Sequence, residues 1–252
     1  MSNTSRVDKA LFEEGHYLGK PADANDLLVK RRIEVLKEFD GFFDDSAVLL
    51  DIGCGNGNTS LAIANGFKEV IGLEYAATHE HDYLELKSSL GVKNATFSVA
   101  DICEKSFSPQ VDRILSFEVI EHLPTEDGVR NYASSLRPGG LCAITVPNKW
   151  WIFETHGASL PLLPWNRVPF FSWLPRPLHE RWALARIYTK NRIVKLMKES
   201  GFEVLETKYI MAPMDVIKWK PLQSFLRKWV FNANTTTNPF KAVSIMVYCK
   251  KN

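Results

Sequence analysis

Three glycines at alternate positions, Gly53, Gly55 and Gly57, follow a short apolar run that leads into Asp51. Glycine has no Cβ, so this stretch can adopt positive φ and let a ligand lie against bare backbone. A carboxylate two residues before the first glycine would repel a phosphate group and attract a cation. The residue types and their spacing therefore predict a binding site for a positively charged ligand.

The spacing of the glycines narrows the choice of ligand. The dinucleotide fingerprint G-x-G-x-x-G needs its third glycine at position 58, where this sequence has Asn58. The run DIGCGNG at 51–57 resembles the first motif of class I S-adenosylmethionine (SAM)-dependent methyltransferases, whose cofactor has a sulfonium, an ammonium and no phosphate. The resemblance implies that Asp51 and the three glycines bind SAM. A dinucleotide site and a purely structural glycine turn are the alternatives.

Two further acids stand at the ends of predicted strands. Glu74 lies near the end of the segment EVIGLEY, 69–75, and 23 residues after Asp51. An acid at about this distance past a glycine loop can accept hydrogen bonds from both ribose hydroxyls. Asp101 followed by Ile102 resembles the adenine site of the same family, in which the carboxylate accepts the exocyclic amine and the apolar neighbour packs on the ring. A polar strand end is the alternative for Asp101.

The segment after the fourth predicted strand holds Glu118, Glu121 and His122 in the pattern E-x-x-E-H. This pattern is similar to that of the polyprenyl-quinone O-methyltransferases of ubiquinone biosynthesis and of the small-RNA 3′-end 2′-O-methyltransferases. In both groups these positions can hold a divalent cation, and oxygen and imidazole ligands suit Mg, Mn or Zn. We therefore expect Glu118, Glu121 and His122 to be catalytic, as metal ligands or with His122 as a metal-free base. A positioning or helix-capping role is the alternative.

Two other histidines, His156 and His179, lie in a later, aromatic part of the chain. The small-RNA enzymes need one more histidine downstream, but neither of these falls in the downstream motif of that family. The RNA interpretation is weaker for that reason. Either histidine can serve as a general base, although a surface or hydrogen-bonded histidine is the more common finding.

The elements that must position these residues alternate along the chain. Strand patterns occupy 47–50, 69–75, 95–101, 111–119, 141–148, 202–210 and 242–250, and helical patterns occupy 26–39, 79–89 and 189–200. This alternation predicts an α/β fold with a parallel sheet and right-handed crossovers. The family resemblance implies a Rossmann-like, seven-stranded, mostly parallel sheet with helices on both faces and an antiparallel last strand.

We predict two regions, an N-terminal helical lid at 1–45 and a class I methyltransferase domain at 46–252. In the family an N-terminal helix often closes over SAM. Phe12, His16 and Tyr17 can belong to such a lid, with ordinary packing or disorder as the alternative.

Two extra segments interrupt the domain, at 149–188 and 211–235, and all seven tryptophans lie from Trp150 onward. The first segment follows strand five at the carboxyl edge of the sheet, where substrates bind in open α/β folds. The second is apolar and basic, and we expect Pro221 to break it. Residues 156–188 and 214–231 are predicted either to cap the acceptor or to touch a membrane surface.

Charge and cysteine content bear on partners and compartment. The net charge of +2 selects no partner and is well short of that of a strongly basic nucleic-acid-binding domain. Four of the five arginines in the basic stretch 156–195 either hold a phosphate or carboxylate of the acceptor or form a solvated face; they are Arg176, Arg181, Arg186 and Arg192. The four cysteines are scattered and form no C-x-x-C pair, and neither a signal peptide nor a membrane-spanning run is apparent. We therefore predict a cytoplasmic protein. It would be peripheral on a membrane if the extra segments bind one.

These features favour a SAM-dependent methyltransferase that modifies a hydroxyl of a small-molecule, hydrophobic or lipid-like acceptor. Transfer to a hydroxyl requires loss of a proton and hence a base or a metal, whereas a carboxylate or thiol acceptor requires neither. The rival interpretations are an RNA 2′-O-methyltransferase and a non-catalytic SAM-fold subunit that activates a partner.

Overall fold

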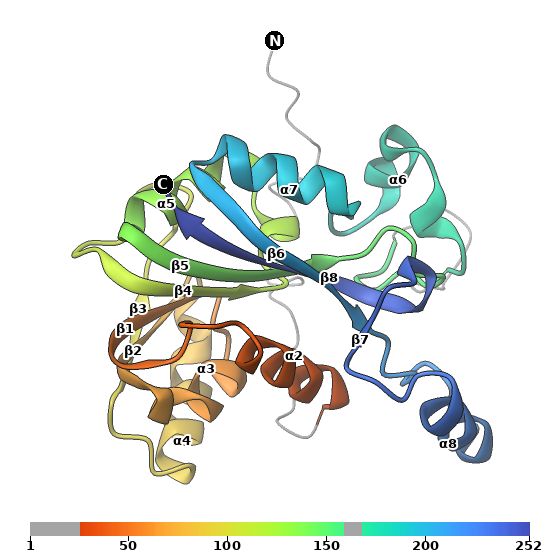
Figure 1. The fold of residues 1–252 in the computed structure, drawn as a ribbon, viewed down its shortest axis with the longest axis horizontal. Helices are drawn as coiled ribbons and strands as arrows, with labels where there is room; N and C mark the ends of the chain where they lie inside the picture. Colours follow the sequence, from red (N-terminus) through yellow and green to blue (C-terminus); the bar gives the residue numbers. More distant parts are fainter. Residues whose placement is uncertain (1–25, 159–167) are drawn as a thin grey trace.

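The computed structural model describes residues 26–158 and 168–252, and its centre is one twisted sheet (Figure 1). From edge to edge the strands run β3-β2-β1-β4-β5-β8-β6-β7. Strands β1 to β5 pair in parallel, whereas β8 lies antiparallel between β5 and β6. The strand bounds are β1 Asp44–Ile52, β2 Phe67–Glu74, β3 Ala95–Val99, β4 Val111–Phe117, β5 Leu136–Pro147, β6 Phe202–Met211, β7 Thr235–Thr236 and β8 Ala242–Lys251.

Eight strands, not the predicted seven, make up the sheet in the described residues. The additional strand is β7, a two-residue strand that pairs antiparallel with Tyr209 and Ile210 of β6. The sequence does not predict it because two neighbouring threonines are too short to show a periodic pattern. The prediction of an antiparallel last strand is confirmed by β8.

Helices cover both faces of the sheet, with α2, α3 and α4 on one face and α5 and α7 on the other (Figure 1). Each face buries its own apolar core, which includes Leu36 and Tyr83 on the first face and Tyr132 and Met197 on the second. Helices α6 and α8 lie toward one end of the long axis. The helix bounds are α2 Leu27–Lys37, α3 Asn58–Ala62, α4 Glu80–Ser89, α5 Val129–Ser135, α6 Arg176–Trp182, α7 Lys190–Glu199 and α8 Lys220–Trp229.

The predicted helices 26–39 and 189–200 correspond to α2 and α7, with ends fixed by capping residues. The side chain of Asp26 accepts a 2.7 Å hydrogen bond from the backbone N–H of Leu28 and so begins α2. Thr189 caps α7 in the same way, through the N–H of Arg192. Gly201, at φ +97°, follows the end of α7, where a left-handed glycine is the usual residue.

Pro221 divides the segment 214–231 in two, as predicted. Residues 214–219 are not helical, and α8 begins at Lys220 with Pro221 in its first turn. Proline is tolerated there because its missing N–H has no partner within the helix at that position. The break therefore falls at the start of a ten-residue helix.

The two extra segments meet beside the sheet although they are far apart in sequence. The first segment is held to itself by a bridge between Phe153 and Pro169. One buried apolar cluster then joins Trp151 of the first segment to Met214 and Phe231 of the second. The rings of Trp151 and Phe231 lie edge to face, with centroids 6.3 Å apart. Both segments are consequently packed onto the same end of the fold.

The predicted lid residues Phe12, His16 and Tyr17 lie outside the described residues, and the boundary between 45 and 46 stays a prediction. All four cysteines are free. In the part of the chain that the structure describes, none of the helices has the length and apolar character needed to span a bilayer.

Candidate active site

The loop after β1 contains three glycines with positive φ. Gly53, Gly55 and Gly57 have φ of +71°, +52° and +79°, a left-handed conformation that costs a residue with a Cβ about 1–2 kcal/mol. A Cβ built on Gly55 meets no atom within 4 Å, so the backbone of this residue borders open space. The Gly55 N–H donates a 2.8 Å hydrogen bond to Oε2 of Glu74 at the end of β2. The loop thus presents bare backbone beside a carboxylate.

The outer two glycines are required by close packing as well. A Cβ on Gly53 would lie 2.4 Å from Cγ2 of Val119, and one on Gly57 would lie 2.6 Å from the ring of Tyr83. Gly53 lines the cavity described below, whereas Gly57 caps the start of α3 and is not among the described residues that line it. The structure therefore gives Gly57 a role in the shape of the loop.

A cavity of about 1270 Å³ opens at the carboxyl ends of the parallel strands. Its wall comes from the glycine loop, from α2 and from both extra segments. Six of the residues predicted to bind the cofactor line it: Asp51, Gly53, Gly55, Glu74, Asp101 and Ile102. The fold therefore gathers at one site residues that the sequence distributes over three strands.

Three carboxylates hold fixed positions in this wall. Asp51 is only 4% exposed, and burial, with a further contribution from the Glu74 carboxylate, raises its pKa to about 7. Besides the Gly55 N–H, Glu74 accepts the N–H of Tyr75 at 2.9 Å. Asp101 accepts the N–H of Cys103 at 2.7 Å. A cation bound here would favour the charged form of Asp51, which burial disfavours.

Glu118, Glu121 and His122 follow β4, the latter two in a single 3-10 turn. Glu118 adopts φ +58°, which is strained for a residue with a Cβ, and it pairs with Arg32 of α2 at 2.8 Å. Glu121 is fully buried, and burial together with the Glu118 charge raises its pKa. Burial and then the charge of His156 lower the pKa of His122 to about 3, so His122 is neutral at physiological pH.

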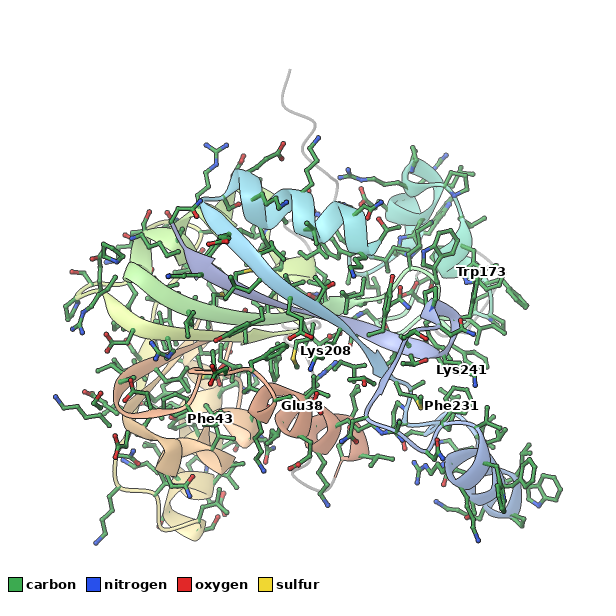
Figure 2. The ribbon with its side chains drawn as sticks, in the orientation of Figure 1. Glu38, Phe43, Trp173, Lys208, Phe231 and Lys241 are labelled. Carbon is green, nitrogen blue, oxygen red and sulfur yellow. The ribbon has the colours of Figure 1, made fainter. Side chains whose placement is uncertain are left out.

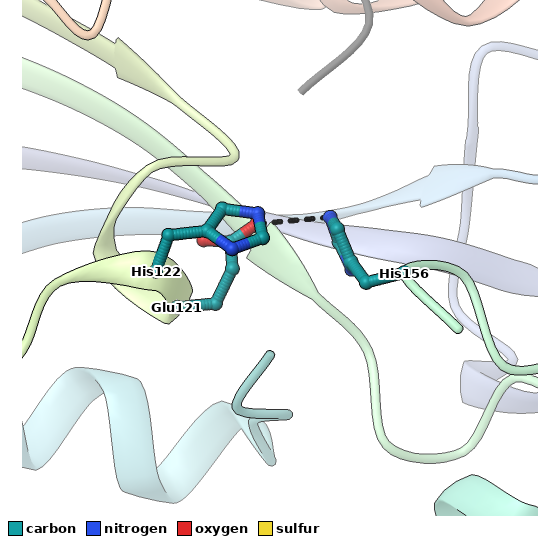
Figure 3. Close-up of side chains that lie close together, drawn as sticks. All are labelled: Glu121, His122 and His156. Atoms are coloured by element: carbon teal, nitrogen blue, oxygen red, sulfur yellow. Dashed lines mark ion pairs between the residues drawn. The ribbon is translucent and has the colours of Figure 1, made fainter. Parts of the chain in front are cut away.

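His156, from the first extra segment, completes this cluster (Figure 3). Its ring centroid lies 4.9 Å from that of His122. Its Nε2 is 3.4 Å from Oε1 of Glu121 and 3.8 Å from Oε2 of Glu118. The sequence identifies His156 only as one of two downstream histidines. It does not predict that His156 contacts Glu121, because no local pattern links the extra segment to the loop after β4. Arg32 was missed for the same reason.

The ligand atoms of Glu121, His122 and His156 all lie within 4.8 Å of one another. This set differs from the predicted metal ligands Glu118, Glu121 and His122, because Glu118 is held by Arg32 instead. One carboxylate and two imidazoles form a donor set that is more typical of Zn or Mn than of Mg. The arrangement has the chemistry to hold a divalent cation or to accept a proton.

A buried carboxylate behind His156 fixes the local backbone. Oε1 of Glu154 accepts the N–H groups of Thr155 and His156 at 3.1 and 3.3 Å. Oε2 lies 2.8 Å from Nε2 of His179 and accepts the Ser172 hydroxyl. Burial raises the pKa of Glu154, but the hydrogen bond and charge of His179 outweigh it, so the pKa is lowered overall. His179 is thus a hydrogen-bonded core histidine, which was one of its two sequence-based alternatives.

The four arginines considered for acceptor binding lie elsewhere. Arg186 is buried and donates to the carbonyls of Leu123 and Pro124 at 2.5 and 2.8 Å. Arg192 pairs with Glu126 at 2.9 Å. Among the described residues, the basic side chains that line the cavity are instead Arg32, Lys218, Lys220 and Arg227. The predicted role of Arg176, Arg181, Arg186 and Arg192 at the acceptor is therefore not supported by their positions.

A Rossmann-like sheet with a glycine loop and strand-end acids around one cavity defines the class of α/β proteins that bind nucleoside cofactors. Residues 24–207 match the model of the methyltransferase domain family, and the chain belongs to that family.

Curated relatives agree with this assignment. The chain is 25% identical over 173 residues to a ubiquinone biosynthesis O-methyltransferase of Bradyrhizobium sp., a match that covers 68% of this chain and 64% of that protein. It is 27% identical over 160 residues to a probable SAM-dependent methyltransferase of Mycolicibacterium smegmatis, covering 63% of this chain and 53% of that protein. The chain thus spans less than two thirds of the length of these relatives.

Solved structures share the fold at low identity. A SAM-dependent methyltransferase from Mesorhizobium loti aligns with a TM-score of 0.61 and 13% identity, covering 91% of this chain and all of that one. The N-methyltransferase NodS from Bradyrhizobium japonicum, solved with S-adenosyl-L-homocysteine, aligns with a TM-score of 0.58 and 11% identity, covering 97% and 98%. The solved structures thus share the fold of this chain, which belongs to the methyltransferase domain family.

Proposed function

We propose that this protein transfers the methyl group of SAM to a hydroxyl of a hydrophobic, lipid-like acceptor. The observation that carries the proposal is the juxtaposition, in one cavity, of the glycine loop, a histidine cluster and a wall of apolar side chains. When bound, SAM supplies a methyl group activated by a sulfonium. The remaining steps belong to the residues of this chain.

The cofactor half of the cavity suits a cation with a nucleoside. The exposed backbone of Gly55 leaves room for close approach, and among the described residues no ion pair is formed with Asp51 that would lower its raised pKa. We assign the ribose hydroxyls to Glu74, the adenine amine to Asp101 and the face of the adenine ring to Ile102, because all three residues line the cavity. These assignments rest on position and on the family resemblance.

The acceptor half is apolar and large. Trp151, Phe153, Met214, Ile217 and Val243 contribute to its wall. Sites for one small molecule occupy about 300–1,000 Å³, and the cavity of about 1270 Å³ exceeds that range. The volume supports simultaneous binding of SAM and of a second, hydrophobic molecule.

The acceptor hydroxyl must lose its proton during transfer, and His156 is the residue best suited to take it. His122, with a pKa of about 3, is too weak a base at physiological pH. Near Nε2 of His156, the Glu118 carboxylate would stabilise the imidazolium that forms, and the imidazolium would in turn favour the charged form of Glu121, which burial disfavours. Glu154 holds the backbone of His156, and the Thr155 hydroxyl, 3.0 Å from Nδ1 of His156, orients the ring.

A divalent cation is the second candidate for this step, favoured by the close approach of three ligand atoms in Glu121, His122 and His156. Both oxygens of Glu121 are buried and accept no hydrogen bond from a described residue. A cation held by these side chains would lower the pKa of the acceptor hydroxyl and thereby replace the base. Dialysis against EDTA separates the two mechanisms, because only the cation-dependent one loses activity and regains it with Mn or Zn.

The test of the function is incubation of the protein with labelled SAM and a cell extract, followed by separation of lipid, nucleic-acid, protein and aqueous fractions. We expect label in the lipid fraction from the natural protein, and at least a ~100-fold lower rate from His156→Ala. His81→Ala, which changes an exposed histidine on α4, is the matched control. Label in RNA would favour the RNA 2′-O-methyltransferase, and SAM binding without any labelled product would favour the non-catalytic subunit.

A further inference from the structure

Helix α8 carries a row of aromatic side chains that face solvent. Trp219, Phe225 and Trp229 are 67%, 56% and 66% exposed, and Leu222 between them is 37% exposed. Their spacing of three or four residues places them on one side of the helix. Tryptophan is seldom this exposed in a folded domain, and a contiguous apolar surface of this kind marks an interaction site.

The other side of α8 is anchored to the protein. The side-chain amide of Gln223 donates to the carbonyls of Met214 and Ile217 at 3.1 and 3.0 Å. Arg227 donates to the carbonyl of Pro213 at 2.7 Å and pairs with Asp215. The helix therefore cannot rotate its aromatic row inward without breaking buried hydrogen bonds.

The charges around this row have one sign. Between 214 and 231 the sequence has four Lys or Arg residues and a single acid, Asp215, which Arg227 already neutralises. The ammonium of Lys228 lies 5.4 Å from the ring of Trp229. Aromatic side chains with lysines beside them are the composition of helices that lie in the headgroup region of an anionic bilayer.

A second exposed aromatic group lies toward the same end of the long axis (Figure 2). Phe170, Trp173 and Phe240 are 52%, 38% and 51% exposed. Their rings contact one another, with centroids 4.9 Å apart for Phe170 and Trp173 and 5.5 Å apart for Trp173 and Phe240. Figure 2 shows Lys241 at this end as well.

We propose that α8 docks this protein onto an anionic bilayer, with Trp219, Phe225 and Trp229 inserted among the headgroups. A bilayer is the occupant that satisfies both the aromatic row and its basic surroundings. Lys218, Lys220 and Gln223 of the same segment line the cavity, so a bilayer-dissolved acceptor would enter beside α8. That entry route rests on the proposed function, whereas docking itself does not.

Flotation of the purified chain with vesicles, in the absence of SAM and acceptor, tests the docking. We expect binding to phosphatidylcholine vesicles that contain roughly one quarter phosphatidylglycerol, and weaker binding at high salt or to phosphatidylcholine alone. Substituting Trp219, Phe225 and Trp229 together by serine should lower the vesicle partition coefficient on the order of a hundredfold. Lys228→Glu should lower it by roughly tenfold.

The control replaces three other exposed apolar residues, Leu84, Leu90 and Leu205, by serine, and these lie on α4, at its end and on β6. Retained vesicle binding by this control is the expected result. Docking is overturned if the natural chain stays with the soluble fraction at low salt, if the two triple variants bind equally, or if the aromatic row instead drives self-association in ultracentrifugation. SAM binding measured by calorimetry on the same samples shows separately whether the proposed function survives.

Discussion

Among single residues, Gly55 combines two requirements that only glycine meets. Its φ of +52° disfavours any Cβ, and the space where a Cβ would point is the cavity. In Gly55→Ala we expect unfolding free energy to fall by about 1–2 kcal/mol. The new methyl group should also weaken SAM binding by on the order of tenfold, which corresponds to about 1.4 kcal/mol.

Gly91→Ala is a matched control for that experiment. Gly91 has φ +66°, and a Cβ there also meets no atom within 4 Å, but the residue follows α4 and does not line the cavity. Denaturation should show a similar loss of stability in both variants, whereas calorimetry should show weaker SAM binding only in Gly55→Ala. Equal affinities would mean that the ligand does not approach Gly55.

We expect Asp51 to make SAM binding depend on pH. Burial, then Glu74, raises its pKa from 3.8 to about 7 in the free protein. Between these values the native state binds a proton that the unfolded state has lost, so this group lowers stability as pH rises through that window. A bound sulfonium would favour the carboxylate form, so binding should release a proton below pH 7.

We therefore expect the Kd for SAM to rise as pH falls below about 7, by up to about tenfold per pH unit, and to level off above it. Calorimetry in two buffers of different ionisation enthalpy would count the released proton. Asp51→Asn should bind SAM more weakly and without this pH dependence. A Kd that is constant between about pH 5.5 and 7.5 would refute the proposed role.

At the scale of single residues, the sequence predicts the positions of some site residues and not of others. Asp51, Glu74 and Asp101 were predictable because each follows a recognisable strand and so must lie at the carboxyl edge. His156 was not, since its partners are reached only through the folding of the extra segment. Arg32 pairs with Glu118 across two elements, and a lone arginine in a helix gives no sign of that contact.

At the scale of elements, α2 connects the two halves of the acceptor side. The buried guanidinium of Arg31 donates to the carbonyls of Met211, Ala212 and Phe231 at 2.9, 2.7 and 2.5 Å. The next residue, Arg32, pairs with Glu118 at 2.8 Å. Helix α2 therefore links the segment that carries α8 to the histidine cluster.

Arg31→Met should disrupt that link. The substitution keeps an apolar stem but leaves three carbonyls without their donor, for an expected loss of roughly 2–4 kcal/mol in unfolding free energy. Limited proteolysis should then cut the segment around α8 before the sheet. Lys30→Met, at an exposed position one residue earlier, is the control and should be nearly neutral. Equal losses in both variants would show that the three hydrogen bonds do not hold the segment.

The elements themselves were predictable to the extent that their patterns are local. The parallel strands and the capped helices α2 and α7 follow from periodicity and from Asp26, Thr189 and Gly201. β7 was not, because a strand of two residues depends on its pairing with β6. Tertiary pairing, rather than propensity, determines this strand.

At the scale of the whole molecule, the cavity has a cofactor side and an acceptor side. A continuous stretch of sequence forms the first, whereas separate stretches form the second. The cofactor side comes from consecutive strands and loops between 44 and 102, whereas the acceptor side is assembled from α2, the loop after β4 and two separate extra segments. The sequence therefore predicts the cofactor residues one by one, whereas on the acceptor side it predicts residues only in the loop after β4 and otherwise indicates a region. Ligand specificity is for this reason best tested on the intact chain.

SAM should stabilise the chain as a whole, since it binds the folded state alone. At a concentration of about 100 times its Kd the expected gain is about 2.7 kcal/mol. For a chain of this length each kcal/mol corresponds to roughly 2–4 °C in Tm, so differential scanning fluorimetry should show a rise of roughly 5–10 °C. NAD at the same concentration should leave Tm unchanged, because its pyrophosphate would face the carboxylates of Asp51 and Glu74. Gly55→Ala should shift less than the natural chain at equal SAM. A rise in Tm with NAD and none with SAM would contradict binding of a cationic cofactor, and the proposed methyl transfer would then lose its basis.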